Sequence, residues 1–222
     1  MIQADFASDV VKRLRSVRVV PVITIDDAAH AVPLARALAA GGLPCAEITF
    51  RTAAAAESIA RITGEVPELF VGAGTVLTPT QANAASEAGA QFIVAPGFGP
   101  RVVEYCQARA IPVFPGIATP TEIEAALEMG LRTLKFFPAE PMGGLAYLKA
   151  IAAPYVEVSF LPTGGINAAN VASYLAFDRV IACGGSWMAP ADWIAAAQFE
   201  RIRDESRRAA DVARGRTPAV VV

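Results

Sequence analysis

Histidine is nearly absent from this 222-residue chain, which holds a single one, His30. A catalytic zinc ion usually has two or three imidazole ligands, so the sequence argues strongly against a zinc-dependent enzyme. The three cysteines, Cys45, Cys106 and Cys183, are an odd number and form no CxxC pair. This pattern is typical of free thiols in a reducing compartment, and we expect a cytoplasmic protein without a metal site.

Long apolar runs are also missing, although hydrophobic residues make up 54% of the chain. No window approaches the roughly 18 unbroken apolar residues that a membrane helix needs. Asp5 and Asp9 stand where a signal peptide would have its apolar segment. The net charge is −2 and the 19 basic residues are spread along the chain, so no basic patch indicates nucleic acid as a partner. We expect no membrane association and no nucleic-acid binding.

The chain does contain a repeated pattern of short apolar runs rich in β-branched and aromatic residues. Eight of these runs start 20 to 26 residues apart, which is long enough for one strand, one helix and two loops. Most are apolar throughout, as expected for parallel strands that are covered on both faces. The predicted strands cover residues 19–25, 45–50, 69–76, 91–97, 111–117, 133–138, 158–165 and 179–186.

The stretches between the runs carry helix signals. Thr78-Pro79 and Thr119-Pro120 each combine an N-cap threonine with a proline at the first helical position. No GxGxxG turn follows the first strand, which disfavours a doubly wound open sheet. Eight strand–helix units predict one α/β domain over 1–222, a (β/α)₈ TIM barrel. An N-terminal helix near 6–16 should close the bottom of the barrel, and a long charged C-terminal helix near 190–213 should end the chain.

Polar residues on the second predicted strand are candidates for the active site, which barrels place at the C-terminal ends of their strands. Glu47, Thr49 and Arg51 lie two residues apart, so their side chains leave the same face. We expect this face to line the barrel interior or its mouth. Burying such groups is costly unless they are paired or used. A Glu47–Arg51 ion pair without a catalytic role is the alternative at this point.

Lys135 is unusual because it is one of only three lysines and lies inside an apolar strand, TLKFFP. Thr133, Lys135 and Phe137 share one face of that strand. A lysine at a strand end that reaches out to water is the ordinary explanation. The functional interpretation is a nucleophilic amine, since burial and a nearby cation such as Arg51 would favour its uncharged form.

The last two predicted strands end in glycine pairs, within TGG (163–165) and GGS (184–186). Glycine allows backbone N–H groups to approach an anion closely. The loops after strands seven and eight of such barrels frequently bind phosphate. Tight turns would explain the glycines equally well, but two such loops in succession favour a phosphate site.

Five motifs together resemble those of the bacterial 2-keto-3-deoxy-6-phosphogluconate (KDPG) and 4-hydroxy-2-oxoglutarate (KHG) aldolase family. They follow one another in the family's order and spacing over nearly the whole chain, and their combination is highly specific. The motifs are EITFRT (47–52), GAGTVL (72–77), KFFPAE (135–140), PTGGI (162–166) and GGSW (184–187).

The resemblance implies a class I aldolase of the Entner–Doudoroff pathway, a homotrimer that needs no metal or organic cofactor. It implies cleavage of KDPG to pyruvate and glyceraldehyde 3-phosphate, and of KHG to pyruvate and glyoxylate. Lys135 would form the Schiff base and Glu47 would transfer protons. The remaining implied roles are Arg51 and Thr75 for the substrate carboxylate, Thr163, Pro96 and Phe137 for substrate contact, and Gly164, Gly165, Gly184, Gly185 and Ser186 for the phosphate.

Three alternatives remain open from the sequence. The 6-phosphogalactonate aldolases share GAGTVL and a KxFP lysine, and cleavage of the two C4 epimers would separate the two substrates. A cofactor-free phosphosugar isomerase or epimerase could use Glu47 as a base, but it would not need Lys135. A non-catalytic phosphosugar binder would bind without turnover.

Overall fold

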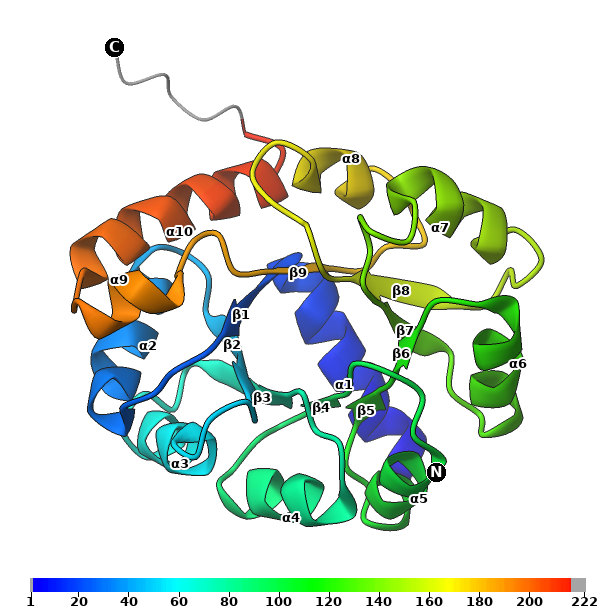
Figure 1. Ribbon diagram of the computed structural model, residues 1–222, viewed down its shortest axis with the longest axis horizontal. Coiled ribbons are helices and arrows are strands. Elements are labelled where there is room, and N and C mark those ends of the chain that lie inside the picture. Colours follow the sequence, from blue (N-terminus) through cyan, green and yellow to red (C-terminus); the bar gives the residue numbers. More distant parts are fainter. Residues whose placement is uncertain (1, 217–222) are drawn as a thin grey trace.

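The computed structural model describes residues 2–216, with side chains from residue 9 onward, so the predicted domain over 1–222 extends beyond it at both ends. Its strands are parallel and follow one another around a ring with helices outside it (Figure 1). The hydrogen-bonded order β5-β4-β3-β2-β1-β9 makes one part of the ring and β6-β7-β8 the other. The strands are β1 Val19–Ile23, β2 Cys45–Thr49, β3 Phe70–Gly74, β4 Ile93–Val94, β5 Val113–Phe114, β6 Gly116–Ile117, β7 Thr133–Phe136, β8 Ser159–Pro162 and β9 Cys183–Gly185.

The fifth predicted strand, 111–117, is present as two short pieces that flank Pro115. Pro115 has no N–H to donate to a neighbouring strand, but its carbonyl oxygen accepts from the backbone N–H of Lys135 over 2.9 Å. β5 pairs with β4 on one side and β6 pairs with β7 on the other. Two single bridges, Phe160 with Val180 and Thr163 with Gly184, join β8 to β9. The ring is therefore closed, and the predicted barrel is confirmed.

Helices cover the outside of the ring and begin at the predicted caps. Thr78 Oγ1 accepts a hydrogen bond from Gln81 N, and Thr119 forms a full capping box with Glu122. Gly89 and Gly130 end their helices with positive φ angles of 96° and 77°. The helices that follow β1 to β8 in chain order are α2 Ala31–Ala40 (preceded by the short 3₁₀ turn Ala28–His30), α3 Ala55–Glu65, α4 Pro79–Glu87, α5 Pro100–Ala108, α6 Pro120–Glu128, α7 Gly144–Ala152 and α8 Val171–Leu175.

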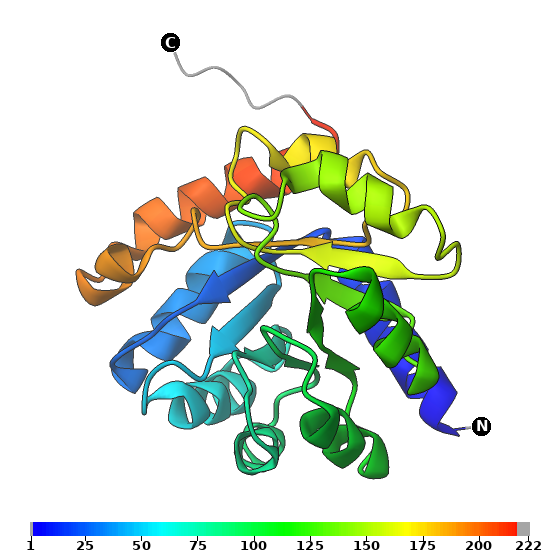
Figure 2. The same ribbon diagram turned by 45° about the vertical axis from the view of Figure 1, so that its right-hand side comes forward.

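The N-terminal helix α1, Ile2–Val17, crosses one end of the ring (Figures 1 and 2). Val10 and Leu14 of this helix are buried against inward-facing residues of the strands. These residues form an apolar cluster that fills the lower half of the barrel: Val20, Cys45, Phe70, Phe92, Val94, Phe114, Leu161, Ile181 and Ala182. The predicted closure of the barrel bottom is confirmed. Polar site residues can therefore lie only toward the other end of the barrel.

The predicted single helix over 190–213 is wrong in its first part. The chain forms a short helix, α9 Ala191–Ala195, and then the long helix α10, Phe199–Ala213. Ala197 lies between them with φ 51°, a left-handed conformation that no α-helix can contain. The long C-terminal helix is therefore present, but it begins at Phe199. Among the helices of residues 2–216, none is long and apolar enough to cross a membrane.

Candidate active site

Lys135 on β7 and Glu47 on β2 meet inside the barrel, although their strands lie on different sides of the ring. Lys135 Nζ donates a hydrogen bond to Glu47 Oε1 over 3.3 Å. Their side chains are only 5% and 4% exposed. An amine and a carboxylate are thus brought together away from bulk water, where each would be costly to bury alone.

The alternation of side chains along β2 explains how Glu47 comes to point inward. Cys45 belongs to the apolar cluster inside the barrel, whereas Ala46 and Ile48 pack in the layer between strands and helices. Thr49 is fully buried, and its hydroxyl donates to the carbonyl oxygen of Ile23 over 2.8 Å. The predicted inward face of this strand is confirmed for the three residues that lie within it.

Glu47 pairs with Lys135 and not with Arg51. Arg51 lies beyond the end of β2 in a turn, where its side chain is exposed and has no ion pair among the described residues. The internal Glu47–Arg51 pair that the sequence left open is therefore absent from this part of the chain. Arg51 therefore lies at the mouth of the barrel as a cation that no described carboxylate neutralises.

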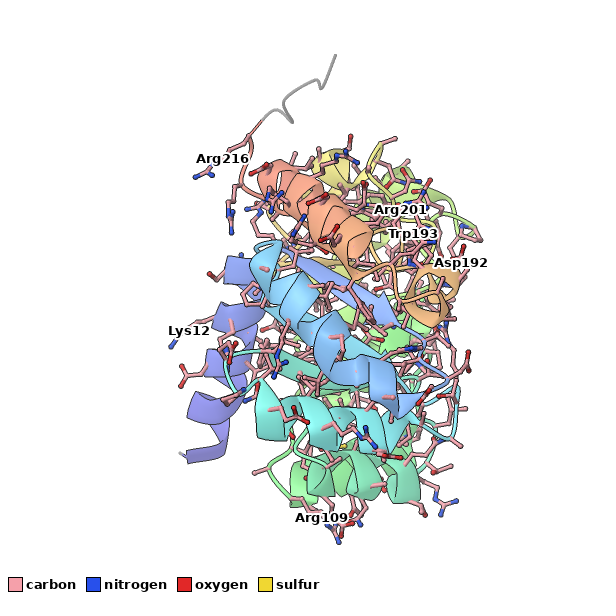
Figure 3. The ribbon with its side chains drawn as sticks, turned by 90° about the vertical axis from the view of Figure 1, so that its left-hand side faces the viewer. Lys12, Arg109, Asp192, Trp193, Arg201 and Arg216 are labelled. Atoms are coloured by element: carbon pink, nitrogen blue, oxygen red, sulfur yellow. The ribbon has the colours of Figure 1, made fainter. Side chains whose placement is uncertain are left out.

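The other two lysines have the ordinary surroundings of that residue. Lys12 points away from α1 into solvent (Figure 3) and pairs with Asp9, with 72% of its side chain exposed. Lys149 is exposed on α7. Lys135 is thus the buried one of the three, and its Nζ lies 5.3 Å from the ring centroid of Phe137.

Two glycines on neighbouring strands have no room for a side chain near this pair. A Cβ on Gly74, at the end of β3, would lie 2.0 Å from Glu47 Oε1. A Cβ on Gly116, the register partner of Lys135 on β6, would lie 2.1 Å from the carbonyl oxygen of Pro96. Both positions need a residue without a side chain, because the carboxylate and the backbone occupy that space.

A pocket of about 360 Å³ opens at the mouth of the barrel. Its lining includes Thr163, which also lines the small internal cavity that contains Lys135, Glu47 and Gly184. The mouth and the buried pair are therefore neighbours. The residues that line the mouth are Val22, Thr24, Arg51, Phe137, Thr163, Gly164, Gly165, Ile166, Gly185, Ser186, Ala189, Pro190 and Ala191.

Most of the predicted site residues are thus brought together, but two are not among those that line either cavity. Thr75 follows β3 next to Gly74 and has φ 55°, a strained conformation for a β-branched residue. Such strain is often found at functional sites. Pro96 follows β4, and its carbonyl group packs against Gly116.

Thr24 also lines the mouth, although it was not among the site residues predicted from the sequence. Its hydroxyl lies 3.2 Å from the Thr49 hydroxyl. Because Thr24 is the first residue after β1 and shares the inward face with Val20 and Val22, the strand-end rule that selected Glu47 would also have selected it.

A larger surface hollow of about 700 Å³ lies between α9 and α10. Trp193 and Arg201, which Figure 3 labels, stack there with the guanidinium carbon 3.7 Å from the ring centroid. None of the predicted site residues lines it. Size alone therefore does not locate the candidate site in this chain. Among the described side chains, those of residues 9–216, no group of three or more His, Cys, Asp or Glu is arranged to hold a metal ion.

Comparisons with known proteins agree with this geometry. The family model for KDPG and KHG aldolase matches residues 10–204. A 2-dehydro-3-deoxy-phosphogluconate aldolase of Treponema pallidum is 56% identical over 85% of this chain and 90% of its own. The KHG/KDPG aldolase of Escherichia coli K12 is 46% identical over 88% of this chain and 92% of its own.

A solved structure adds a chemical detail. The KDPG aldolase of Legionella pneumophila superposes with a TM-score of 0.83 at 39% identity, over 86% of this chain and 92% of that one. That structure holds pyruvate as a covalent carbinolamine intermediate. Sequence, fold and family model all agree, and the chain belongs to the KDPG and KHG aldolase family.

Proposed function

We propose that this protein is a class I aldolase that cleaves KDPG to pyruvate and glyceraldehyde 3-phosphate through a Schiff base on Lys135. The observation that carries the proposal is the buried contact of Lys135 Nζ with Glu47 Oε1 beside a mouth lined by glycine loops. The family's aldolases are carbon–carbon lyases, and the Legionella relative holds pyruvate covalently.

The chemistry needs an amine and one proton-transfer group. The uncharged amine of Lys135 adds to the C2 ketone, and loss of water gives an iminium ion. Glu47, directly or through a water, removes the C4 hydroxyl proton. The C3–C4 bond then breaks, its electron pair forms an enamine with the iminium carbon, and the aldehyde leaves. Glu47 returns the proton to C3, and hydrolysis frees pyruvate and the amine.

The other site residues predicted from the sequence bind the remaining parts of the substrate. Arg51 lines the mouth and has no ion pair with any described residue, which suits a carboxylate ligand, and we assign the same ligand to Thr75. Thr163, Pro96 and Phe137 contact the substrate near the reacting carbons. The phosphate binds at the other end, where the mouth is lined by backbone groups of two loops. We assign it to Gly164, Gly165, Gly184, Gly185 and Ser186.

The test is reductive trapping. With pyruvate and sodium borohydride, the intact mass should rise by one reduced pyruvate adduct, and peptide mapping should place the adduct on Lys135. Lys135→Ala should give no adduct. Lys149→Ala is the matched control and should trap as the parent protein does. Trapping in Lys135→Ala would refute the proposed nucleophile, and phosphosugar isomerisation without trapping would favour an isomerase.

Cleavage of KHG to pyruvate and glyoxylate is the second candidate activity. The matching family model and the E. coli relative both carry this substrate in their names. The same iminium chemistry applies, because the ketone and the scissile bond are placed alike in both substrates. Comparing kcat/KM for KDPG, its C4 epimer and KHG would rank the three.

We further propose that the protein works in the cytoplasm as a homotrimer. The three thiols are free and buried, which suits a reducing compartment. Light scattering should give a mass about three times the 23.2 kDa of one chain. A monomeric mass at micromolar concentration would contradict the trimer.

A further inference from the structure

The loop after β8 has both of its glycine carbonyl groups occupied by hydrogen bonds. The carbonyl oxygen of Gly164 accepts from the backbone N–H of Glu140 over 2.9 Å. The carbonyl oxygen of Gly165 accepts from the side-chain amides of Asn167 and Asn170, over 3.2 and 3.1 Å. Positive φ angles of 100° and 82° at Gly164 and Gly165 permit this backbone path.

These contacts fix the direction of two N–H groups. In a trans peptide the C=O and the following N–H point in opposite directions. With the carbonyls of Gly164 and Gly165 directed at Glu140 and the asparagines, the N–H groups of Gly165 and Ile166 point away from them. Neither N–H has an acceptor within the described part of the chain, and both residues line the mouth. Two adjacent free N–H groups of this kind form an anion-binding concavity.

The loop is held by a second connection from Glu140, which lies in the segment between β7 and α7. Its Oε1 accepts a short hydrogen bond, 2.5 Å, from the hydroxyl of Tyr174 on α8. Helices α7 and α8 lie side by side (Figures 1 and 2). Tyr174 is buried, and Glu140 packs so closely on the loop that a Cβ on Gly165 would lie 2.6 Å from its Cβ.

We propose that Glu140 and Tyr174 form a positioning pair that holds the Gly164–Gly165 loop in its phosphate-binding orientation. Neither side chain lines the mouth, and we assign neither of them a contact with the substrate. The pair acts through the backbone. The Tyr174 hydroxyl holds the Glu140 carboxylate in place, and this restrains the backbone of Glu140. The backbone N–H of Glu140 in turn holds the Gly164 carbonyl in its orientation. This inference rests on the proposed function, since it takes the substrate phosphate as the ligand of that loop.

The state of the phenol agrees with this role. Burial first, and then the hydrogen bond and the charge of Glu140, raise the pKa of Tyr174 above its ordinary value. The hydroxyl therefore stays protonated and remains a donor at any physiological pH. The hydrogen bond also neutralises part of a carboxylate charge that would otherwise disfavour a phosphate nearby.

The test compares substrates with and without the phosphate. Glu140→Ala and Tyr174→Phe should each raise KM for KDPG on the order of tenfold, the equivalent of one weakened hydrogen bond to a charged group, with kcat little changed. Their KM for unphosphorylated 2-keto-3-deoxygluconate should stay as in the parent protein. Inorganic phosphate should inhibit both variants more weakly. The KM of the double variant for KDPG should be no higher than that of either single variant, because both substitutions remove the same contact.

Two controls separate positioning from general damage. Glu140→Gln keeps an acceptor for the Tyr174 hydroxyl and should restore most of the affinity for KDPG. Tyr155→Phe removes a comparable bond, 2.9 Å to Glu124, at a surface site away from the mouth and should change neither KM. Because Glu140 is exposed, its variants should fold even if Tyr174→Phe does not.

The outcomes distinguish the two proposals. Borohydride trapping of pyruvate needs no phosphate site, so all these variants should trap normally at Lys135. If the parent protein does not trap, the proposed function fails. If trapping is normal but Glu140→Ala leaves KM for KDPG unchanged or lowers it, the positioning pair is refuted. Equal rises in KM for both substrates would also refute it.

Discussion

Gly74 on β3 and Glu47 on β2 are in such close contact that the glycine has no room for a side chain. A Cβ at position 74 would lie 2.0 Å from Glu47 Oε1 and 2.6 Å from both Cγ and Cδ. The two strands are in register, with Thr49 opposite Gly74. The carboxylate therefore runs over the glycine toward Lys135, and the position of Glu47 depends on a residue of the neighbouring strand.

Gly74→Ala should therefore impair turnover. The added methyl group must move the carboxylate away from Lys135, and such overpacking typically costs about 1–3 kcal/mol of stability. We expect kcat/KM for KDPG to fall by at least about tenfold, since small displacements of a proton-transfer group are costly. Gly64→Ala is the matched control, because a Cβ there meets nothing within 4 Å. It should leave kcat/KM unchanged, and equal losses in both variants would contradict the explanation.

Glu47→Gln should separate covalent capture from turnover. The amide keeps the size of the side chain but cannot take the C4 proton, and loss of a general base typically lowers kcat about 10²–10⁴-fold. Borohydride trapping of pyruvate at Lys135 should persist. Stopped-flow kinetics measures kcat, and intact mass spectrometry measures the trapped adduct. Glu57→Gln is the control, because it removes a surface carboxylate paired with Arg61, and it should change neither kcat nor trapping. A kcat for Glu47→Gln close to that of the parent would exclude Glu47 as the base.

The barrel was predictable because its signals are local and repeated. Apolar runs and Thr-Pro caps, such as Thr119 with Glu122, gave the strand and helix order correctly. The break at Ala197 was not predictable, since alanine favours helix and nothing in the sequence indicates a left-handed residue there. The division of the fifth strand at Pro115 was not predictable from the missing proline N–H alone, because Pro21 lies within the unbroken strand β1.

The candidate site was only partly predictable. Strand parity predicted that Glu47 lines the barrel interior or its mouth and that Lys135 shares a face with Thr133 and Phe137, but parity cannot say which residue of another strand a side chain meets. The Glu47–Lys135 contact spans 88 positions of sequence and depends on how the ring closes. The Glu140–Tyr174 bond likewise joins a loop residue to a residue of helix α8, which only the fold brings together.

The three thiols should be unreactive in the folded protein. Burial raises the pKa of Cys106 to about 11, and it raises the pKa of Cys45 and Cys183 further above the ordinary value. Because the thiolate is the reactive form, iodoacetamide at pH 8 should leave the native chain unlabelled. After unfolding in guanidinium, three labels should appear by mass spectrometry. Rapid labelling of one native cysteine would contradict the burial of that residue.

Thr75→Gly should separate backbone strain from substrate binding. The φ of 55° costs a β-branched residue about 1–2 kcal/mol, which glycine largely avoids, so we expect no loss of thermal stability. The hydroxyl proposed to bind the substrate carboxylate is lost, and a hydrogen bond to a charged group is worth about 1.5–3 kcal/mol. Half-maximal trapping should therefore need about tenfold or more pyruvate. Ala110→Gly, also at φ 55° but in the exposed turn before β5, should relieve similar strain and trap normally. Unchanged pyruvate dependence in Thr75→Gly would remove Thr75 from the carboxylate site.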